Sequence, residues 1–311
     1  MSPAPESPPV ESPVVVAQGR PARVWTVFVG FVVALVVLLG LNALVFAAYL
    51  VRALQGRATP VSRADLTALL RALPENLPVI ILSALGSVVA FAGVALVAGA
   101  LSKEPLRERL QLRGTPGPWT VYPVVTLGFL AVSETLGSVI HLSGLHRRSS
   151  LAQLDRVFRT AGPQGLAVTL LVVGVGAGVA EELFFRGYLQ SRLARRWPPW
   201  VAIAVTAALF GLVHFDPVHS TFAVSVGCFL GWIAWRARSI LPTIAAHIFN
   251  NTVATLASAS GHEEQSRNEN LAAAAVGLAL SIAAVVWLHR KLPPSVKPIP
   301  TGTARHSVQS P

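Results

Sequence analysis

Residues 27–51 read VFVGFVVALVVLLGLNALVFAAYLV and contain no charged side chain. At about 1.5 Å of rise per residue, roughly 20 helical residues cross the roughly 30 Å hydrocarbon core of a bilayer. A strand of a membrane β-barrel would alternate apolar and polar residues at every second position, and this stretch does not. It therefore predicts a membrane-spanning helix. Several further runs of similar character predict an all-α polytopic membrane protein.

The composition of the whole chain excludes a water-soluble globular protein. Of its 311 residues, 53% are hydrophobic and only 13% are charged, whereas about a quarter of the residues of a soluble domain are charged. The single cysteine, Cys228, cannot form an intramolecular disulfide or a cysteine-rich metal cluster.

The apolar runs predict about eight spans within a helical membrane domain at 23–290. The Pro-rich flanking segments, 1–22 and 291–311, are expected to be disordered tails. The fourth span becomes charged at Glu181 and continues as an amphipathic, basic stretch to Pro198. The expected spans cover about 24–51, 77–101, 119–142, 163–181, 199–214, 219–236, 240–259 and 271–289.

The formal net charge of +11 would suggest a nucleic-acid partner in a soluble protein, but membrane proteins concentrate Lys and Arg in their cytoplasmic loops. Fifteen Lys and Arg fall on the side of both termini and nine on the other side, with Arg186 left out because it lies at the edge of a span. This bias predicts a multi-pass cell-membrane protein with cytoplasmic termini. Membrane lipids, and not nucleic acid, are then its surroundings.

A short acidic and basic motif, AEELFFRGYLQ, interrupts the fourth span. Charges at membrane depth are costly unless paired or hydrated, so they indicate a functional site. Glu181 and Glu182 point about 100° apart on a helix, so they cannot serve one small site in the same way. Arg186 follows Glu182 by four residues, which also fits a purely structural ion pair on one helical face.

Two further spans carry polar residues. Phe210 and His214 belong to LFGLVHF, and His247 and Asn251 share one face of LPTIAAHIFNN. The fourth and fifth spans form a helical hairpin. Glu182 and His214 lie equally far from its turn on the two spans, which places them at similar depth. His247 follows Ile240 by only seven residues, so it meets them only if the fourth and fifth spans extend or tilt. A polar contact between helices is the alternative for His247 and Asn251.

A carboxylate, two imidazoles and a carboxamide can together hydrolyse an amide bond. A glutamate among apolar neighbours can take a proton from water as a general base, and a histidine can hold the water or protonate the leaving amine. A second histidine with an asparagine can donate hydrogen bonds to the oxyanion. A zinc site built from His214, His247 and Glu181 stays open, because two His and one Glu form a known catalytic zinc set.

Three motifs now stand in order: EExxxR at Glu181, Glu182 and Arg186, FxxxH from Phe210 to His214, and HxxxN from His247 to Asn251. In order and spacing they resemble the CPBP family, which includes the type II CAAX prenyl endopeptidases and bacterial relatives linked to bacteriocin processing and self-immunity. The resemblance covers about 115–255.

The resemblance implies an intramembrane endopeptidase that cleaves protein or peptide substrates at the membrane, without a cofactor. By analogy, Glu181 is the base that activates water, His214 is its partner, and His247 with Asn251 stabilises the oxyanion. Glu182 and Arg186 act as support. Members are often labelled metalloproteases, but the glutamate-dependent, metal-free mechanism is the one we favour.

Two other functions remain open at this point. The first is a non-catalytic immunity or adaptor protein of the same fold, and the second is a small transporter whose acids and histidines relay protons. Prenyl specificity does not follow from the motifs. Glu134 and His141, seven residues apart on one face of the third span, lie outside all three motifs.

Overall fold

The computed structural model describes residues 23–55, 61–261 and 265–292, and within these ranges the chain forms helices and turns without a strand. The α-helices are α1 (Trp25–Leu54), α2 (Arg63–Ala72), α3 (Leu77–Ala100), α4 (Leu106–Arg109), α5 (Val121–Leu142), α6 (Ser150–Arg159), α7 (Pro163–Thr169), α8 (Gly178–Glu181), α9 (Ser191–Leu193), α10 (Pro199–Leu212), α11 (Pro217–Ala237), α12 (Leu241–Ser260) and α13 (Arg267–Lys291). The 3₁₀ turns are η1 (Leu73–Glu75) and η2 (His146–Arg148), and the π-helical segments are η3 (Leu170–Ala177) and η4 (Glu182–Gln190).

Six helices in the described residues are long and apolar enough to cross a membrane: α1, α3, α5, the continuous rod from α7 to α9, α11 and α13. The chain is therefore a helical polytopic membrane protein, as the sequence predicts. Two of the eight expected spans fall outside this group. α10 has only 14 residues, and α12, with 20 residues, carries His247 and two asparagines that lower its apolarity.

The expected tails fall mostly on residues that lie outside the described ranges. This applies to the whole of 1–22 and to the C-terminal segment from residue 293 onward. Within the described chain, α13 continues to Lys291.

Local sequence signals explain where several helices begin. Ser62 and Ser266 each form a capping box, with Asp65 and Glu269 respectively, and so satisfy the first free N–H groups of α2 and α13. Asp216 caps α11 by accepting a hydrogen bond from the His219 N–H, and Pro at the next position favours helix initiation.

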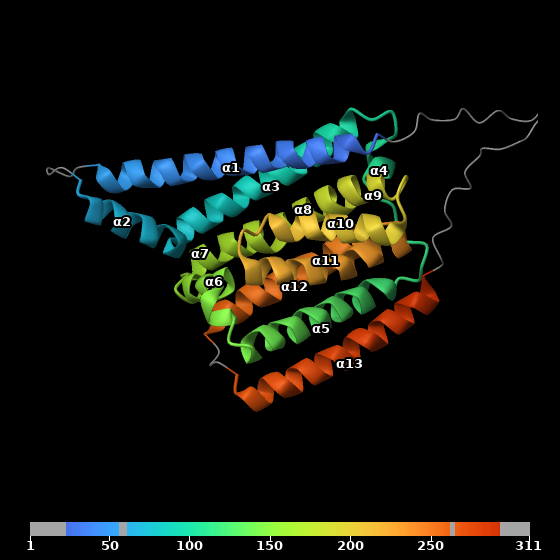
Figure 1. The fold of residues 1–311 in the computed structure, drawn as a ribbon. Helices are drawn as coiled ribbons and strands as arrows, with labels where there is room; N and C mark the ends of the chain where they lie inside the picture. Colours follow the sequence, from blue (N-terminus) through green and yellow to red (C-terminus); the bar gives the residue numbers. More distant parts are fainter. Residues whose placement is uncertain (1–22, 56–60, 262–264, 293–311) are drawn as a thin grey trace, which may run out of the picture.

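The helices lie roughly side by side (Figure 1). α1 and α3 cover one side of the bundle, α5 and α13 cover the other, and the α7–α9 rod, α10, α11 and α12 lie between them. The start of α1 and the end of α13 lie at the same end of the bundle, which is called here the terminal end. The loops after α5, α10 and α12 lie at the opposite end.

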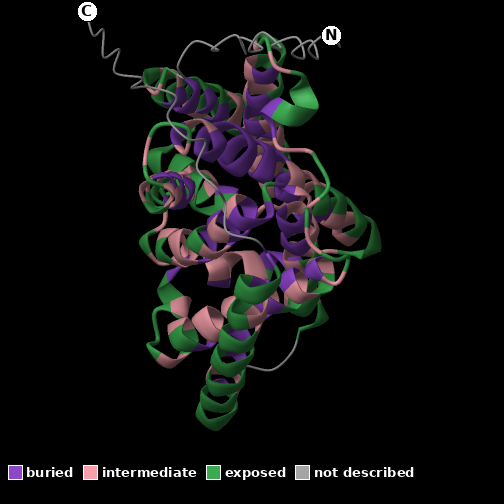
Figure 2. Cartoon of the chain, turned by 90° about the vertical axis from the view of Figure 1, so that its right-hand side faces the viewer, coloured by how far each residue is buried: buried purple, intermediate pink, exposed green. Residues whose placement is uncertain are grey.

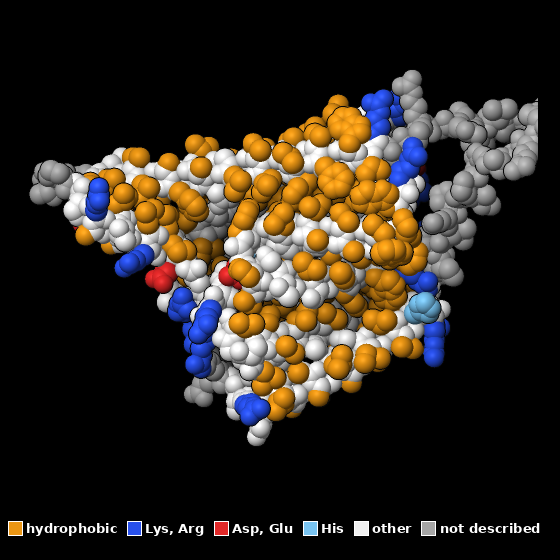
Figure 3. All heavy atoms as spheres, in the orientation of Figure 1, with side chains coloured by type: hydrophobic (Ala, Val, Ile, Leu, Met, Phe, Trp, Pro, Cys, Tyr) orange, Lys and Arg blue, Asp and Glu red, His pale blue; other side chains and the backbone are white. Residues whose placement is uncertain are grey.

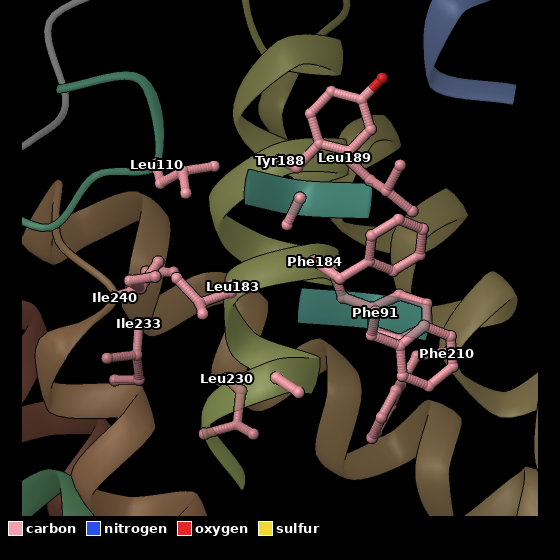
Figure 4. Close-up of a cluster of buried hydrophobic side chains, with 14 of the residues drawn as sticks. Phe91, Leu110, Leu183, Phe184, Tyr188, Leu189, Phe210, Leu230, Ile233 and Ile240 are labelled. Atoms are coloured by element: carbon pink, nitrogen blue, oxygen red, sulfur yellow. The ribbon is translucent and has the colours of Figure 1, made fainter. Parts of the chain in front are cut away.

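The core gathers around η4. Figure 4 shows Phe184 and Leu189 of η4 among Phe91 of α3, Phe210 of α10 and Leu230 of α11. All of these side chains are buried, and Figure 2 shows the buried residues concentrated in the middle of the bundle. The segment that carries Glu182 and Arg186 of the EExxxR motif therefore lies in the core, since every residue from Glu182 to Gln190 is buried.

The outer surface suits a bilayer. Figure 3 shows hydrophobic side chains spread over the face between α1 and α13, with Lys and Arg gathered at its two ends. All seven tryptophans lie in the half of the bundle next to the terminal end, where an aromatic belt would meet the lipid headgroups. They are Trp25, Trp119, Trp197, Trp200, Trp232, Trp235 and Trp287.

Two glycines four residues apart allow α12 to approach the rod closely. A Cβ added at Gly178 would lie 3.0 Å from the backbone nitrogen of Ile248, and one added at Gly174 would lie 3.0 Å from the Thr252 hydroxyl. Small residues at this spacing let helix backbones pack closely in membranes. The close approach places His247 of α12 beside the acids of the rod.

We predict that Gly178→Val lowers the melting temperature of the detergent-purified protein, because a branched side chain would push α12 away at a cost of about 1–3 kcal/mol. Gly93→Val is the matched control, since a Cβ at Gly93 of α3 meets nothing within 4 Å. Equal melting temperatures for the two variants would show that this close approach does not hold the helices together.

Candidate functional site

The three motifs meet where the rod, α10, α11 and α12 converge. Glu181 ends α8, Glu182 and Arg186 lie on η4, Phe210 lies on α10, and His247 lies on α12. The sequence predicted that these segments come together, and the structure brings their side chains into direct contact.

The rod is π-helical on both sides of Glu181, in η3 and η4. A π-helix closes its hydrogen bonds over five residues and is rare, and π-helical turns occur frequently at functional sites. The irregular backbone changes the direction in which successive side chains leave the helix. Because adjacent side chains leave a helix in different directions, Glu181 and Glu182 have different environments.

Glu182 and Arg186 form an ion pair that is closed to solvent. Arg186 Nη1 donates a 2.6 Å hydrogen bond to Glu182 Oε1, and the side chains are 2% and 0% exposed respectively. Charges buried in this way are stable only when they are paired and hydrogen-bonded. The pair therefore belongs to the interior of the bundle and not to the membrane interface.

Arg186 also connects two neighbouring helices to the rod. Its Nη2 donates a 3.3 Å hydrogen bond to the Gly227 carbonyl of α11, and its guanidinium lies 4.7 Å from the ring centroid of Phe210 on α10. A cation over an aromatic face is attracted by the ring electrons. Arg186 thus helps to position Phe210, the first residue of the FxxxH motif.

His247 lies between the two glutamates. Its Nδ1 is 3.0 Å from Glu182 Oε1, and its Nε2 is 3.5 Å from Glu181 Oε2. A carboxylate can only accept, so the short contact places a proton on Nδ1 and leaves Nε2 to face Glu181. The imidazole is also held edge-on by two rings, with Phe129 at 5.9 Å and Phe210 at 6.1 Å between centroids.

Glu181 has a different environment from Glu182. Its side chain keeps 14% of its surface exposed, and its carboxylate makes a long contact of 3.5 Å with His247 Nε2. Glu182 is fully buried and is held by both Arg186 and His247. Of the two adjacent acids, Glu181 is therefore the one that water can reach.

His214 follows the last turn of α10 and is half-buried. Its Nδ1 is 2.8 Å from the Phe210 carbonyl, and its ring packs edge-on against the Phe210 ring at 5.1 Å between centroids. Because a carbonyl can only accept, Nδ1 carries the proton in this contact, and Nε2 keeps a free lone pair. Phe210 is thus the common neighbour of His214 and His247.

Asn251 lies one turn beyond His247 on α12 and is half-buried. Its Nδ2 donates a 3.2 Å hydrogen bond to the Val173 carbonyl in η3. One of the two amide protons of Asn251 thereby joins α12 to the rod.

The sequence analysis missed the residues that support His214. The ring of His219 lies 4.3 Å from that of His214, and its Nδ1 is 3.2 Å from the Ser150 hydroxyl. Asp216 accepts from the backbone N–H of both His219 and Ser150. The sequence does contain a signal for this arrangement, because Asp216 followed by Pro217 is typical of a helix start. His219 then lies in the first turn of that helix, close to Asp216.

Glu134 and His141 lie away from this site. Glu134 is exposed on α5, where its Oε1 is 3.5 Å from the Ser138 hydroxyl. His141 is exposed at the end of α5, and its ring stacks on that of His146 at 3.9 Å. The two residues share a helix face, as their spacing predicts, and their contacts with Ser138 and His146 lie outside the three motifs.

The donor geometry does not fit a catalytic zinc ion. Zinc sites gather three or more His, Cys, Asp or Glu ligands around one point, and no such group occurs within the described ranges. Nδ1 of His247 is committed to Glu182, and Nε2 faces Glu181 alone. The set His214, His247 and Glu181 is therefore not arranged as a ligand set, and no step below is routed through a metal.

Comparison with known families supports the motif analysis. Residues 163–253 match the family model described as type II CAAX prenyl endopeptidase Rce1-like, so this segment is similar to that family. The matched segment contains all three motifs. No curated protein and no solved structure matches the chain.

We predict that Arg186→Met destabilises the protein by about 3–5 kcal/mol, because it leaves the Glu182 carboxylate buried without its cation. Glu181→Gln, which changes an acid that is in part exposed, should leave the melting temperature within a few degrees of the wild type. The reverse order of thermal stability would contradict the division of these acids into a structural and a solvent-accessible one.

Proposed function

We propose that this protein, a CAAX/CPBP-type membrane protease by its Rce1-like domain, hydrolyses peptide bonds of membrane-associated substrates with a water activated by Glu181. The observation that carries the proposal is the unequal environment of the two adjacent glutamates. The Glu182 carboxylate is buried and its charge is balanced by Arg186, whereas Glu181 is reachable by water and faces Nε2 of His247.

In the proposed first step, the Glu181 carboxylate removes a proton from a water molecule as that water attacks the scissile carbonyl carbon. His214 assists with its free Nε2, which can accept a hydrogen bond from the same water and hold it in place. The carbonyl oxygen becomes an oxyanion as the new C–O bond forms.

The oxyanion is then stabilised by hydrogen-bond donors. His247 and Asn251 supply them in this proposal, since each has a hydrogen-bonding group that is not committed to the protein interior. Such a donor typically contributes roughly 3 kcal/mol to stabilisation of the transition state. Glu182 stabilises positive charge on His247, which makes its Nε2 a donor when a proton from Glu181 reaches it.

Collapse of the tetrahedral intermediate breaks the C–N bond. The proton held by Glu181 or its histidine partner passes to the leaving amine, which regenerates the carboxylate. Glu182 and Arg186 take no part in these transfers and act as positioning residues for His247 and Phe210.

We further propose that both termini lie in the cytoplasm, with support from the excess of Lys and Arg in the tail and loops on that side. The substrates are protein or peptide segments at the bilayer. Their identity, and whether they carry a prenyl group, is left to experiment.

Glu181→Gln tests the base directly. We expect it to lower cleavage by a factor of about 10² or more, since it removes general-base catalysis. Membrane proteomics of cells with wild-type protein and with the variant would reveal peptide fragments that depend on Glu181, and these fragments then provide a purified assay.

Glu134→Gln is the matched control, because it makes the same chemical change on an exposed position of α5. Cleavage retained by Glu181→Gln would refute the mechanism. A biological phenotype that is unchanged by Glu181→Gln would instead favour the non-catalytic adaptor.

A second test concerns the metal. We expect cleavage by the purified protein to persist after treatment with EDTA or 1,10-phenanthroline, because the described side chains do not gather into a zinc site. Loss of activity after chelation, with recovery when zinc is added, would contradict the metal-free mechanism. The assignment of Glu181 as the base would still stand.

A further inference from the structure

A cleft lies at the end of the bundle opposite the termini, away from the three motifs. It consists of two adjoining chambers of about 520 and 420 Å³ that share His141, His146 and Asn270. The end of α5, the turn η2, α6 and the start of α13 enclose it, and these elements lie together in Figure 1.

Basic side chains dominate the described lining. Arg148 and Arg267 line the larger chamber, and Arg156 lines the smaller one. The described lining of the larger chamber includes no carboxylate. Figure 3 shows Lys and Arg gathered at this end of the molecule, next to the apolar face.

The one acid in the described lining of the smaller chamber is already engaged. Asp155 Oδ2 lies 3.1 Å from His146 Nε2, and Asp155 Oδ1 accepts from the Ser258 hydroxyl. Burial raises the pKa of Asp155, but these two hydrogen bonds outweigh it and hold the pKa below its ordinary value. Asp155 therefore stays ionised at neutral pH and is bound to its own partners.

The cleft also has an ordered polar wall. Asn270 is 5% exposed, and its Nδ2 donates to the carbonyls of Gln265 and Ser266, which fixes the first turn of α13. Apolar side chains adjoin the basic lining. Leu145 and Leu271 are 48% and 49% exposed, next to residues that line the cleft.

We propose that this cleft binds a phosphate group, and that the group is the headgroup phosphate of an anionic phospholipid. Arginine donates paired hydrogen bonds that match the oxygens of a phosphate. Leu145 and Leu271 would lie against the acyl chains, which a free phosphate does not have.

Isothermal titration of the full-length protein in detergent tests the proposal. The ligands are dioctanoyl phosphatidylglycerol, dioctanoyl phosphatidylcholine and inorganic phosphate. We expect phosphatidylglycerol to bind at least tenfold more tightly than phosphatidylcholine, and inorganic phosphate to compete only weakly.

The variant R148Q/R267Q should weaken phosphatidylglycerol binding about tenfold or more, because charge-assisted hydrogen bonds are lost. Both arginines are exposed, so folding should persist, and an unchanged melting temperature without lipid verifies this. The matched control is R63Q/R71Q, which removes two exposed arginines from α2 at the same end of the bundle.

Other outcomes of the titrations would overturn either the lipid as the ligand or the site itself. Equal binding of phosphatidylglycerol and inorganic phosphate, both lost in R148Q/R267Q, would keep the phosphate site but overturn the lipid as its source. Equal binding of the two lipids, or equal weakening by both arginine pairs, would overturn the site.

Discussion

The organisation of this protein depends on a carboxylate that has no access to water. Glu182 is fully buried, and its Oε1 is shared by Arg186 and His247. A lone charge in that position would cost several kcal/mol, so both partners contribute to the stability of the fold. Through Arg186 the same charge positions Gly227 of α11 and Phe210 of α10. Four chain segments are therefore aligned by one ionised group inside an otherwise apolar core.

The alignment also requires that helices come unusually close. Gly174 and Gly178 let α12 pack against the backbone of the rod. π-Helical segments lie on both sides of Glu181, and the side chains of Glu181 and Glu182 leave the rod in different directions. One glutamate thereby supports the interior, and the other keeps contact with water beside His247. A regular α-helix with larger residues at these positions would not separate the two roles in the same way.

The positions of several spans could be predicted from the sequence, because the length of an apolar run and the residues that end helices act locally. The expected span at 77–101 is α3, Leu77–Ala100, and the expected span at 119–142 is α5, Val121–Leu142. The depth of His247 could not be predicted, since it depends on the π-helical segments and on the 31-residue length of the rod. The support of His214 by His219 and Ser150 was also missed, because Ser150 lies 69 residues before His219 in the chain.

Glu182 and His247 are in contact and together join the rod to α12. A double-mutant cycle on thermal unfolding, with Glu182→Gln, His247→Gln and the double variant, measures their coupling most directly. We expect an interaction energy of about 1–3 kcal/mol between the two positions. Additive effects of the two substitutions would contradict it, because they would mean that the buried carboxylate and the imidazole stabilise the bundle independently.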